Sequence, residues 1–321
     1  MVKSLQLQAE MMQEFGACVF DVTLDCEDGA PVGGEVDQAK LVVALANAAY
    51  AATNLIASGA RRRVGARLHA VDHPAFASDA DIVVGGAAQS LSYIMVPKVE
   101  SVDDVQRAIA AIDLATASSH RATPIPLHVL IESPAAVHRA FEIAAHPRVE
   151  SISFGLMDFV SSHGGAIPSS AMTVRKDDDN TTLDQFHHPL VVRAKLDIAS
   201  ACHAFGKVPS HCVVTEFRDT FALKQAAAVA ASALGFTRMW SIHPDQIRPI
   251  LEAFSPAKAE VELAAQIVVQ AQAQNWAPIS VAGKLHDRAS VRYFWQVLER
   301  AHQTGVAIPA EAAVYFSSAV H

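Results

Sequence analysis

Apolar and polar positions along the chain form a repeating pattern of short and long segments. Short runs rich in Val, Ile and Leu alternate with longer Ala-rich runs whose apolar residues recur at helical spacing. The short runs predict strands at residues 18–24, 64–68, 93–96, 127–131, 152–154, 208–213 and 239–242. The long runs predict helices at residues 37–58, 104–117, 190–204 and 219–234. This alternation is typical of parallel strands joined by right-handed crossovers.

The number of strand–helix units favours a (β/α)₈ TIM barrel. An open doubly wound sheet uses the same alternation, but no glycine-rich phosphate turn follows the first strand, which weakens that alternative. Seven strands are clear, and the short segment from Ser4 to Leu7 is the candidate for the eighth. We expect the barrel to occupy residues 1–255 as the catalytic domain.

The pattern changes after Pro256. Residues 257–275 and 290–302 predict two further helices, and residues 278–285 are expected to be extended. We expect residues 256–321 to form a C-terminal helical extension that packs on a neighbouring subunit or covers a site as a lid. Within the barrel, the polar residues 161–188 predict a long excursion over its mouth, whose role the sequence does not indicate.

Composition narrows the class of protein. Hydrophobic residues make up 51% of the chain and aromatic residues 7%, which suits Ala-rich helices that cover buried strands. A net charge of −8 without a long basic stripe argues against a nucleic-acid partner. The four cysteines lack metal-site spacings, so we expect reduced thiols in a cytoplasmic protein. No signal peptide or membrane-spanning run is expected from the sequence, so neither is a membrane partner.

Charged side chains gather where the predicted strands end. They are Asp25, Glu27 and Asp28 after the first strand, Arg67, Lys98, Glu132 and Asp158 at the next four, and His243 at the last. In a barrel these strand ends share one face, which is where active sites lie. Carboxylates that converge on an apolar core are costly unless a cation neutralises them, and hard oxygen ligands suit Mg²⁺ or Mn²⁺ better than zinc.

Each of these residues also has a simpler structural explanation. The acids after the first strand could cap the following loop, with Arg67 as their structural partner. Glu132 could serve the dipole of the next helix, and Asp158 could cap a helix. A histidine before proline, as at His243, is more often a strand-end residue than a base. If all of these explanations held, the charged residues would have gathered on one face of the barrel by chance.

Several short motifs strengthen the prediction because they occur in a fixed order. They are residues 21–30 (DVTLDCEDGA), 67–69 (RLH), 97–100 (PKVE), 130–134 (LIESP), 154–158 (FGLMD), 234–236 (LGF) and 240–246 (WSIHPDQ). Together they resemble the HpcH/HpaI aldolase and citrate lyase β-subunit family, including its malyl-CoA lyase-like members. The chain departs from that family's pattern at His69, where asparagine is usual.

The resemblance implies a (β/α)₈ barrel in which Glu132 and Asp158 bind Mg²⁺. It also implies that Arg67 contacts the substrate carbonyl. Backbone N–H groups of Gly155, Leu156 and Met157 would hold a carboxylate.

The resemblance also suggests a role for the C-terminal extension. Members of the family that act on thioesters carry a C-terminal lid from a neighbouring subunit, with an acid–base aspartate. Residues 283–287 (GKLHD) match the lid motif, which makes Asp287 the acid–base candidate. The alternative for Asp287 is the N-cap of a surface helix.

These observations together predict a carbon–carbon lyase. We expect it to cleave or form a 3-hydroxyacyl thioester such as citryl-, malyl- or citramalyl-CoA, with an acyl thioester and a 2-oxo acid as partners. The thioester carrier is CoA or an acyl-carrier protein, and the lid favours a homotrimer or hexamer. The alternatives are an aldolase that acts on free 2-oxo acids and a non-catalytic homologue that binds acyl-CoA or an organic acid.

Overall fold

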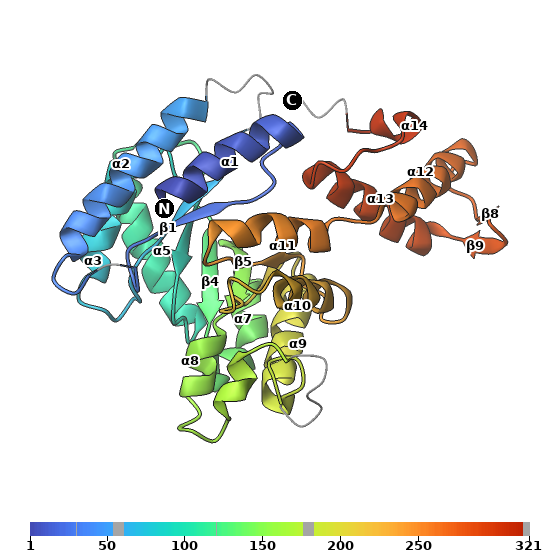
Figure 1. The fold of residues 1–321 in the computed structure, drawn as a ribbon. Helices are drawn as coiled ribbons and strands as arrows, with labels where there is room; N and C mark the ends of the chain where they lie inside the picture. The colour runs from blue at the N-terminus through green and yellow to red at the C-terminus, as the bar shows by residue number, and fades with distance from the viewer. Residues whose placement is uncertain (30, 54–60, 120, 176–182, 317–321) are drawn as a thin grey trace.

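The structure is a computed structural model, and it describes residues 1–29, 31–53, 61–119, 121–175 and 183–316. Seven strands form one sheet in which each strand pairs in parallel with the next one along the chain (Figure 1). They are β1 (Val22–Asp25), β2 (Val64–Arg67), β3 (Tyr93–Val96), β4 (Leu127–Ile131), β5 (Val149–Phe154), β6 (Val208–His211) and β7 (Arg238–Met239). All seven carboxyl ends therefore lie at one edge of the sheet, as the sequence predicts.

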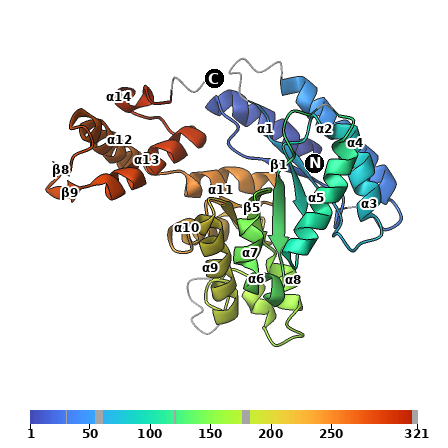
Figure 2. The same cartoon turned by 180° about the vertical axis from the view of Figure 1, so that it is seen from behind.

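Helices lie around this sheet on the outside of its curve (Figure 2). They are α1 (Val2–Phe15), α2 (Glu35–Thr53), α3 (Phe76–Asp79), α4 (Gly85–Ala87), α5 (Val102–Thr116), α6 (Pro134–His138), α7 (Ala140–Ala145), α8 (Leu156–Ser161), α9 (Pro189–Ala204), α10 (Thr220–Ser232) and α11 (Ile247–Phe254). A π-helical segment, η1 (Ala80–Val84), joins α3 to α4, and two 3₁₀ turns are η2 (Ser169–Met172) and η3 (Pro244–Gln246). The main core lies between the strands and these helices.

Local chemistry explains where several helices begin. Ser133 accepts a hydrogen bond from the N–H of Ala136, and Pro134 occupies the first turn of α6. Ser101 and Asp104 form a reciprocal capping box at the start of α5. Strands β2, β3 and β4 are buried throughout, as expected of parallel strands covered on both faces.

The predicted segments agree with the structure, except at the eighth strand. Strands β3 and β4 match the prediction residue for residue, and β7 ends before the predicted segment 239–242 does. The predicted end of the helix at residue 58 lies outside the described residues. The prediction of a strand from Ser4 to Leu7 is wrong, because this segment belongs to α1. Its apolar contacts come from Leu5, Met11 and Met12, at helical spacing rather than alternating.

The sheet is a curled seven-stranded layer rather than a closed eight-stranded barrel. No pairing joins β7 to β1 among the described residues. Arg238 on β7 reaches across this open side, and its guanidinium lies 2.8 Å from Asp21, next to β1. Asp21 also accepts from Arg63, at 3.3 Å. An ion-pair cluster therefore stands where strand hydrogen bonds would close a barrel.

The interior of the curled sheet is unusually polar at this open side. The hydroxyls of Thr23 and Tyr93 lie 2.7 Å apart, and His128 Nε2 lies 2.7 Å from the Ser153 hydroxyl. Burial lowers the pKa of His128 to about 3, so its ring is neutral. These residues line a cavity of about 1270 Å³ that extends to Arg67 at the carboxyl edge.

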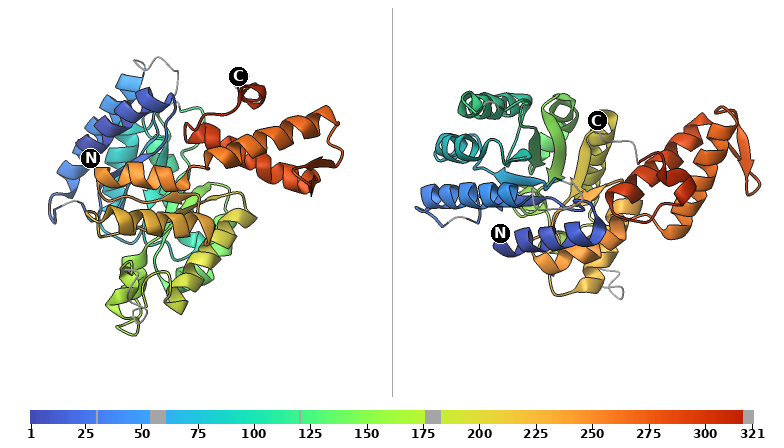
Figure 3. Two further views of the ribbon diagram at one scale, coloured as in Figure 1. Left: turned by 45° about the vertical axis from the view of Figure 1, so that its right-hand side comes forward. Right: turned by 90° about the horizontal axis from the view of Figure 1, so that it is seen from above.

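The C-terminal residues form a separate helical layer to one side of the sheet (Figures 1 and 3). It comprises α12 (Lys258–Ala273), the hairpin strands β8 (Ile279–Val281) and β9 (Lys284–His286), α13 (Arg288–Gln303) and α14 (Ala310–Ala313). Its buried residues form a cluster of their own, drawn from residues 261–312. The predicted helices 257–275 and 290–302 correspond to α12 and α13, and the predicted extended segment is the hairpin.

Two further predictions concern the thiols and membrane-spanning segments. All four cysteines are free, as expected from their spacing. Among the described helices, none combines the length and the apolar character needed to cross a membrane.

Candidate active site

Arg67, at the end of β2, is surrounded by carboxylates from the turn after β1. Its guanidinium lies 2.7 Å from Asp25, 2.7 Å from Glu27 and 3.3 Å from Asp28. Burial works against its charge, but the hydrogen bond and charge of Asp25, followed by the charges of Glu27 and Asp28, outweigh this and raise its pKa. Arg67 is therefore a fixed cation at the carboxyl edge of the sheet.

Two neighbours hold Arg67 in place. The indole of Trp240, which follows β7, lies 5.3 Å from its guanidinium carbon, within range of a cation–π contact. Glu27 bridges Arg67 to Lys98, whose ammonium lies 2.6 Å from the second carboxylate oxygen. The loops after β1, β2, β3 and β7 thus meet in one charged network, which includes the predicted Asp25, Glu27, Asp28 and Lys98.

Glu132 and Asp158, from the ends of β4 and β5, form the second part of the site. Glu132 is 6% exposed, and its carboxyl lies within hydrogen-bonding reach of that of Asp158. Burial first, and then the charge of Asp158, raise the pKa of Glu132. The burial of Glu132 beside a second carboxyl therefore disfavours its charged form unless a cation is bound.

Gly155 makes the close approach of these carboxyls sterically feasible. A Cβ atom at this position would lie 2.4 Å from Cγ of Glu132, so no larger residue fits without displacing it. The N–H of Gly155 donates to the carbonyl of Ile131 at 2.9 Å. It is therefore already engaged in the sheet. Leu156 and Met157 begin α8, where backbone N–H groups have no partner within the helix.

The two remaining predicted site residues, His243 and Asp287, lie in different parts of the molecule. His243 lines the same cavity as Asp25 and Arg67, and its ring caps η3 by accepting from the N–H of Asp245 at 3.2 Å. Asp287 caps α13, where its carboxylate accepts from the N–H groups of Ala289 and Ser290, each at 3.0 Å. These hydrogen bonds, that of Ser290 first, lower the pKa of Asp287. Asp287 lies between β9 and α13, and Figure 1 shows both elements in the C-terminal layer, far from α8, which follows β5 at the carboxyl edge of the sheet.

His69 is buried beside a partner that the sequence did not reveal. Both its backbone N–H, at 2.9 Å, and its ring Nδ1, at 2.6 Å, meet the same carboxylate oxygen of Asp79. Its ring stacks on that of His73, with centroids 4.3 Å apart. Asp79 and Trp240 are therefore the partners that sequence reasoning missed. Trp240 belongs to the motif at residues 240–246, whereas no sequence pattern pointed to Asp79.

The carboxyl pair suits a hard divalent cation. A buried acid held against an exposed one is the arrangement that a cation would relieve, and both groups offer oxygen ligands. In the part of the chain that the structure describes, no three His, Cys, Asp or Glu side chains group in a way that could hold a metal ion. Glu132 and Asp158 would therefore supply two ligands and leave the rest to water and substrate, as is common for Mg²⁺.

Comparison with known proteins places this site in a family. The model of the HpcH/HpaI aldolase/citrate lyase family matches residues 4–244. The L-malyl-CoA/β-methylmalyl-CoA lyase of Rhodobacter capsulatus is 28% identical over 253 residues, which cover 75% of this chain and 76% of that protein. A crystal structure of a citrate lyase from Burkholderia xenovorans is 44% identical and has a TM-score of 0.81. It covers 98% of this chain and 92% of that one.

A more distant structure shares the fold. It is CitE from Mycobacterium tuberculosis in complex with magnesium, acetoacetate and coenzyme A, which is 21% identical. The TM-score is 0.63, over 93% of this chain and 95% of that one. The family model covers most of the chain and includes every predicted site residue before the C-terminal extension. The chain therefore belongs to the HpcH/HpaI aldolase/citrate lyase family.

Proposed function

We propose that this carbon–carbon lyase uses a divalent metal to cleave or form a 3-hydroxyacyl thioester. The products of cleavage would be an acyl thioester and a 2-oxo acid, as for citryl-, malyl- or citramalyl-CoA. The observation that carries the proposal is the carboxyl pair of Glu132 and Asp158 beside the buried cation Arg67. The malyl-CoA lyase relative supports the thioester as the substrate class.

Glu132 and Asp158 would hold the metal, which we expect to be Mg²⁺ or Mn²⁺. When bound, the metal supplies Lewis acidity and orients the keto oxygen and carboxylate of the 2-oxo acid. The magnesium in the M. tuberculosis structure supports this choice. Leu156 and Met157 would direct their free N–H groups towards the substrate carboxylate. Gly155 would contribute its small size, since its N–H is engaged with Ile131.

Arg67 would stabilise the oxygen that becomes negative when the C–C bond breaks. Its position is set before substrate arrives, because Asp25, Glu27 and Trp240 fix the guanidinium. A preorganised cation needs little reorganisation during the reaction, which is the main source of electrostatic catalysis. Lys98 and Asp28 support this arrangement from the neighbouring loops.

Asp287 would exchange the proton at the enolate carbon, from the extension of a neighbouring subunit. In a single chain it caps α13, a helix that lies far from α8 and the carboxyl edge of the sheet (Figure 1). We therefore propose residues 1–255 as the catalytic domain and residues 256–321 as an extension whose lid completes the site of another copy. A homotrimer or hexamer would satisfy this geometry.

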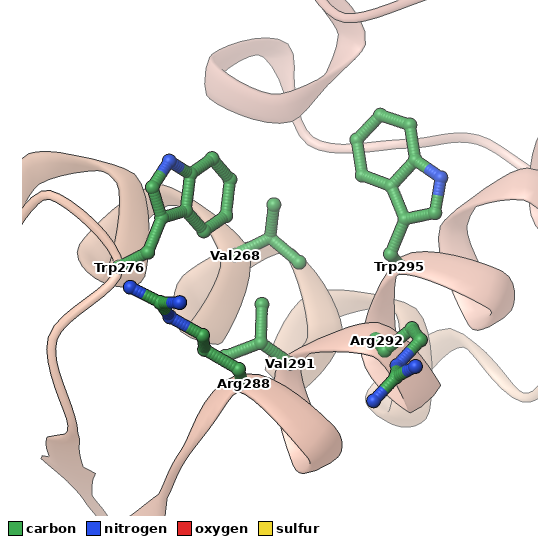
Figure 4. Close-up of a pocket in the computed structure, with 6 residues that line it drawn as sticks. All are labelled: Val268, Trp276, Arg288, Val291, Arg292 and Trp295. Carbon is green, nitrogen blue, oxygen red and sulfur yellow. The ribbon is translucent and has the colours of Figure 1, made fainter.

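The extension also presents cations next to Asp287. Arg288 and Arg292 lie one turn apart on α13 and line an open pocket of about 640 Å³ with Trp276 and Trp295 (Figure 4). Neither arginine forms an ion pair within the described residues. Unpaired arginines beside aromatic rings suit the phosphates of a thioester carrier, either CoA or the phosphopantetheine of an acyl-carrier protein.

The proposal can be tested by incubating the full chain with Mg²⁺ and a panel of 3-hydroxyacyl-CoA thioesters. Mass spectrometry would detect the acyl-CoA and the 2-oxo acid. We expect turnover of at least one thioester. Glu132→Gln should remove a metal ligand and lower the rate by about 10²-fold or more. Glu150→Gln is the matched control, because Glu150 pairs with Arg63 at the opposite ends of the strands.

The same panel separates the alternatives. Turnover of free hydroxy acids without a thioester would instead assign a thioester-independent aldolase. Such an enzyme would not need Asp287 for its chemistry, and the role of Asp287 as the cap of α13 is compatible with that alternative. Binding of acyl-CoA without any turnover would assign a non-catalytic homologue. Full activity of the Glu132→Gln variant would contradict the metal site.

A further inference from the structure

A lysine without an acidic partner is buried behind the sheet. Lys195, on α9, is 0% exposed. Its ammonium or amine nitrogen donates to Gln185, at 3.1 Å from the backbone carbonyl and 2.8 Å from the side-chain oxygen. It also lies 4.2 Å from the centre of the Phe186 ring. No carboxylate lies within ion-pair distance of Lys195 among the described residues.

Burial without such a partner disfavours the charged form of a lysine. It lowers the pKa of Lys195 to about 8. The nearby carboxylate of Asp184 is engaged with the N–H groups of Arg175 and Phe186. A substantial fraction of Lys195 is therefore a neutral amine in mildly alkaline solution, and a neutral amine is a nucleophile.

A thiol shares the acceptor of this amine. The Sγ atom of Cys212, just after β6, donates to the side-chain oxygen of Gln185 at 3.2 Å. The amine and the thiol therefore converge on one oxygen atom, at 2.8 Å and 3.2 Å. The side-chain nitrogen of Gln185 is buried and has no partner among the described residues. Gln185 therefore holds both groups together through one oxygen while its own amide stays unsatisfied.

The side chains packed beside this pair are aromatic rings and add no charge of their own. The ring of His211 is stacked on that of Phe186, with centroids 5.5 Å apart, and its edge faces Phe236. Burial first, and then the charge of Lys195, lower the pKa of His211, so it adds no cation. The Lys195 amine and the Cys212 thiol are thus enclosed together, and the neighbouring His211 ring is neutral.

We propose that Lys195 and Cys212 are an oxidation-sensitive pair that forms a covalent cross-link between α9 and the end of β6. A peroxide is the oxidant. Sγ attacks the peroxide O–O bond, which gives a sulfenic acid and releases the other oxygen as water or an alcohol. The Lys195 nitrogen then attacks sulfur and the S–O bond breaks. The hydroxyl leaves as water with a proton from nitrogen.

The balance of this step defines its product. Sulfur loses two electrons, the peroxide gains them, and the joined residues have lost two hydrogens. The cross-link would remove the S–H donor from Gln185 and leave one N–H on the Lys195 nitrogen, so the hydrogen bonds that hold Gln185 would change. Oxidation would thus change how Gln185 is held between α9 and the end of β6.

The chain contains matched control thiols. Cys26 and Cys202 are also 0% exposed, and burial raises the pKa of each to about 12. Neither has a lysine amine among its described hydrogen-bond partners. All three thiols are therefore buried, and Cys212 differs from the other two because it shares the Gln185 oxygen with the Lys195 amine.

The full chain is treated with hydrogen peroxide near pH 8, and free thiols are then alkylated in denaturant. Trypsin digestion and mass spectrometry follow. We expect a joined pair of peptides that contains Lys195 and Cys212 and lacks two hydrogens. We also expect missed cleavage after Lys195 and reversal of both changes by dithiothreitol. Cys26 and Cys202 should stay fully alkylated.

Two outcomes would overturn the inference. One is Cys212 that alkylates as completely as Cys26 and Cys202 after peroxide. The other is Cys212 oxidised to sulfinic acid while trypsin still cleaves after Lys195. Lys195→Arg keeps the charge and should abolish the joined peptide. The wild-type measurement does not depend on the folding of any variant or on the proposed lyase activity.

Discussion

At the scale of single residues, the site is organised by the cost of burying charge. Arg67 is buried yet charged because three carboxylates surround it, whereas burial first and the neighbouring Asp158 second raise the pKa of Glu132. The sequence identified these residues from their positions at strand ends. It did not indicate which acid would serve the arginine and which would pair with another acid, because that depends on distances between loops.

Gly155 offers a test of the carboxyl pair at this scale. Gly155→Ala should push the Glu132 side chain aside, since the new Cβ would lie 2.4 Å from its Cγ. We expect a destabilisation of about 1–3 kcal/mol and a weakening of Mg²⁺ affinity by roughly tenfold or more. Isothermal titration with Mg²⁺ and thermal unfolding would measure the two effects.

The control for this change is Gly85→Ala, because a Cβ at Gly85 would lie 3.8 Å from the carbonyl oxygen of Ala115, an ordinary van der Waals contact. Its Mg²⁺ affinity should equal that of the unmodified chain. Unchanged Mg²⁺ affinity in the Gly155→Ala variant would contradict the assignment of Glu132 as a ligand.

At the scale of elements, caps and apolar periodicity account for what was predictable. The start of α6 after β4 follows from local chemistry of this kind, because Ser133 caps the helix and Pro134 occupies its first turn. The prediction failed at residues 4–7, where four residues are too few to distinguish alternation from a helical stripe. The full segment from Val2 to Phe15 places Leu5 and Gln8 on one face, which is the helical pattern.

Asp287 has two candidate roles, and substitutions can separate them. Asp287→Asn retains an N-cap acceptor, so thermal stability should change little while turnover falls by about 10²-fold. Asp287→Ala should lower the turnover equally and also destabilise α13 by about 1 kcal/mol. Steady-state kinetics and thermal unfolding of both variants provide the comparison.

Asp219 serves as the matched cap, since its carboxylate accepts from the N–H of Ala222 at the start of α10. Asp219→Asn should leave both turnover and stability nearly unchanged. If Asp287→Asn also kept full turnover, Asp287 would be a cap without a role in the chemistry.

At the scale of the whole molecule, the separation of Asp287 from its own carboxyl edge predicts a site shared between subunits. Glu132→Gln and Asp287→Asn chains should each be inactive as pure oligomers. After dissociation, mixing and reassociation, some sites would combine an intact Glu132 with an intact Asp287. We therefore expect a clear gain in turnover over the sum of the two, together with a trimer or hexamer in sedimentation velocity. A mixture no more active than its components would assign Asp287 to its own chain or to no site.

The sequence by itself determined the order of strands and helices, the edge where the charged residues lie, and the family. These features follow from hydrophobic period, helix caps and short motifs, which act over a few neighbouring residues. The tertiary structure decided that the sheet stays open between β7 and β1, that Glu132 meets Asp158, and that Lys195 and Cys212 share the side-chain oxygen of Gln185. Such contacts join residues from different elements, and the burial that sets their protonation exists only once the chain has packed.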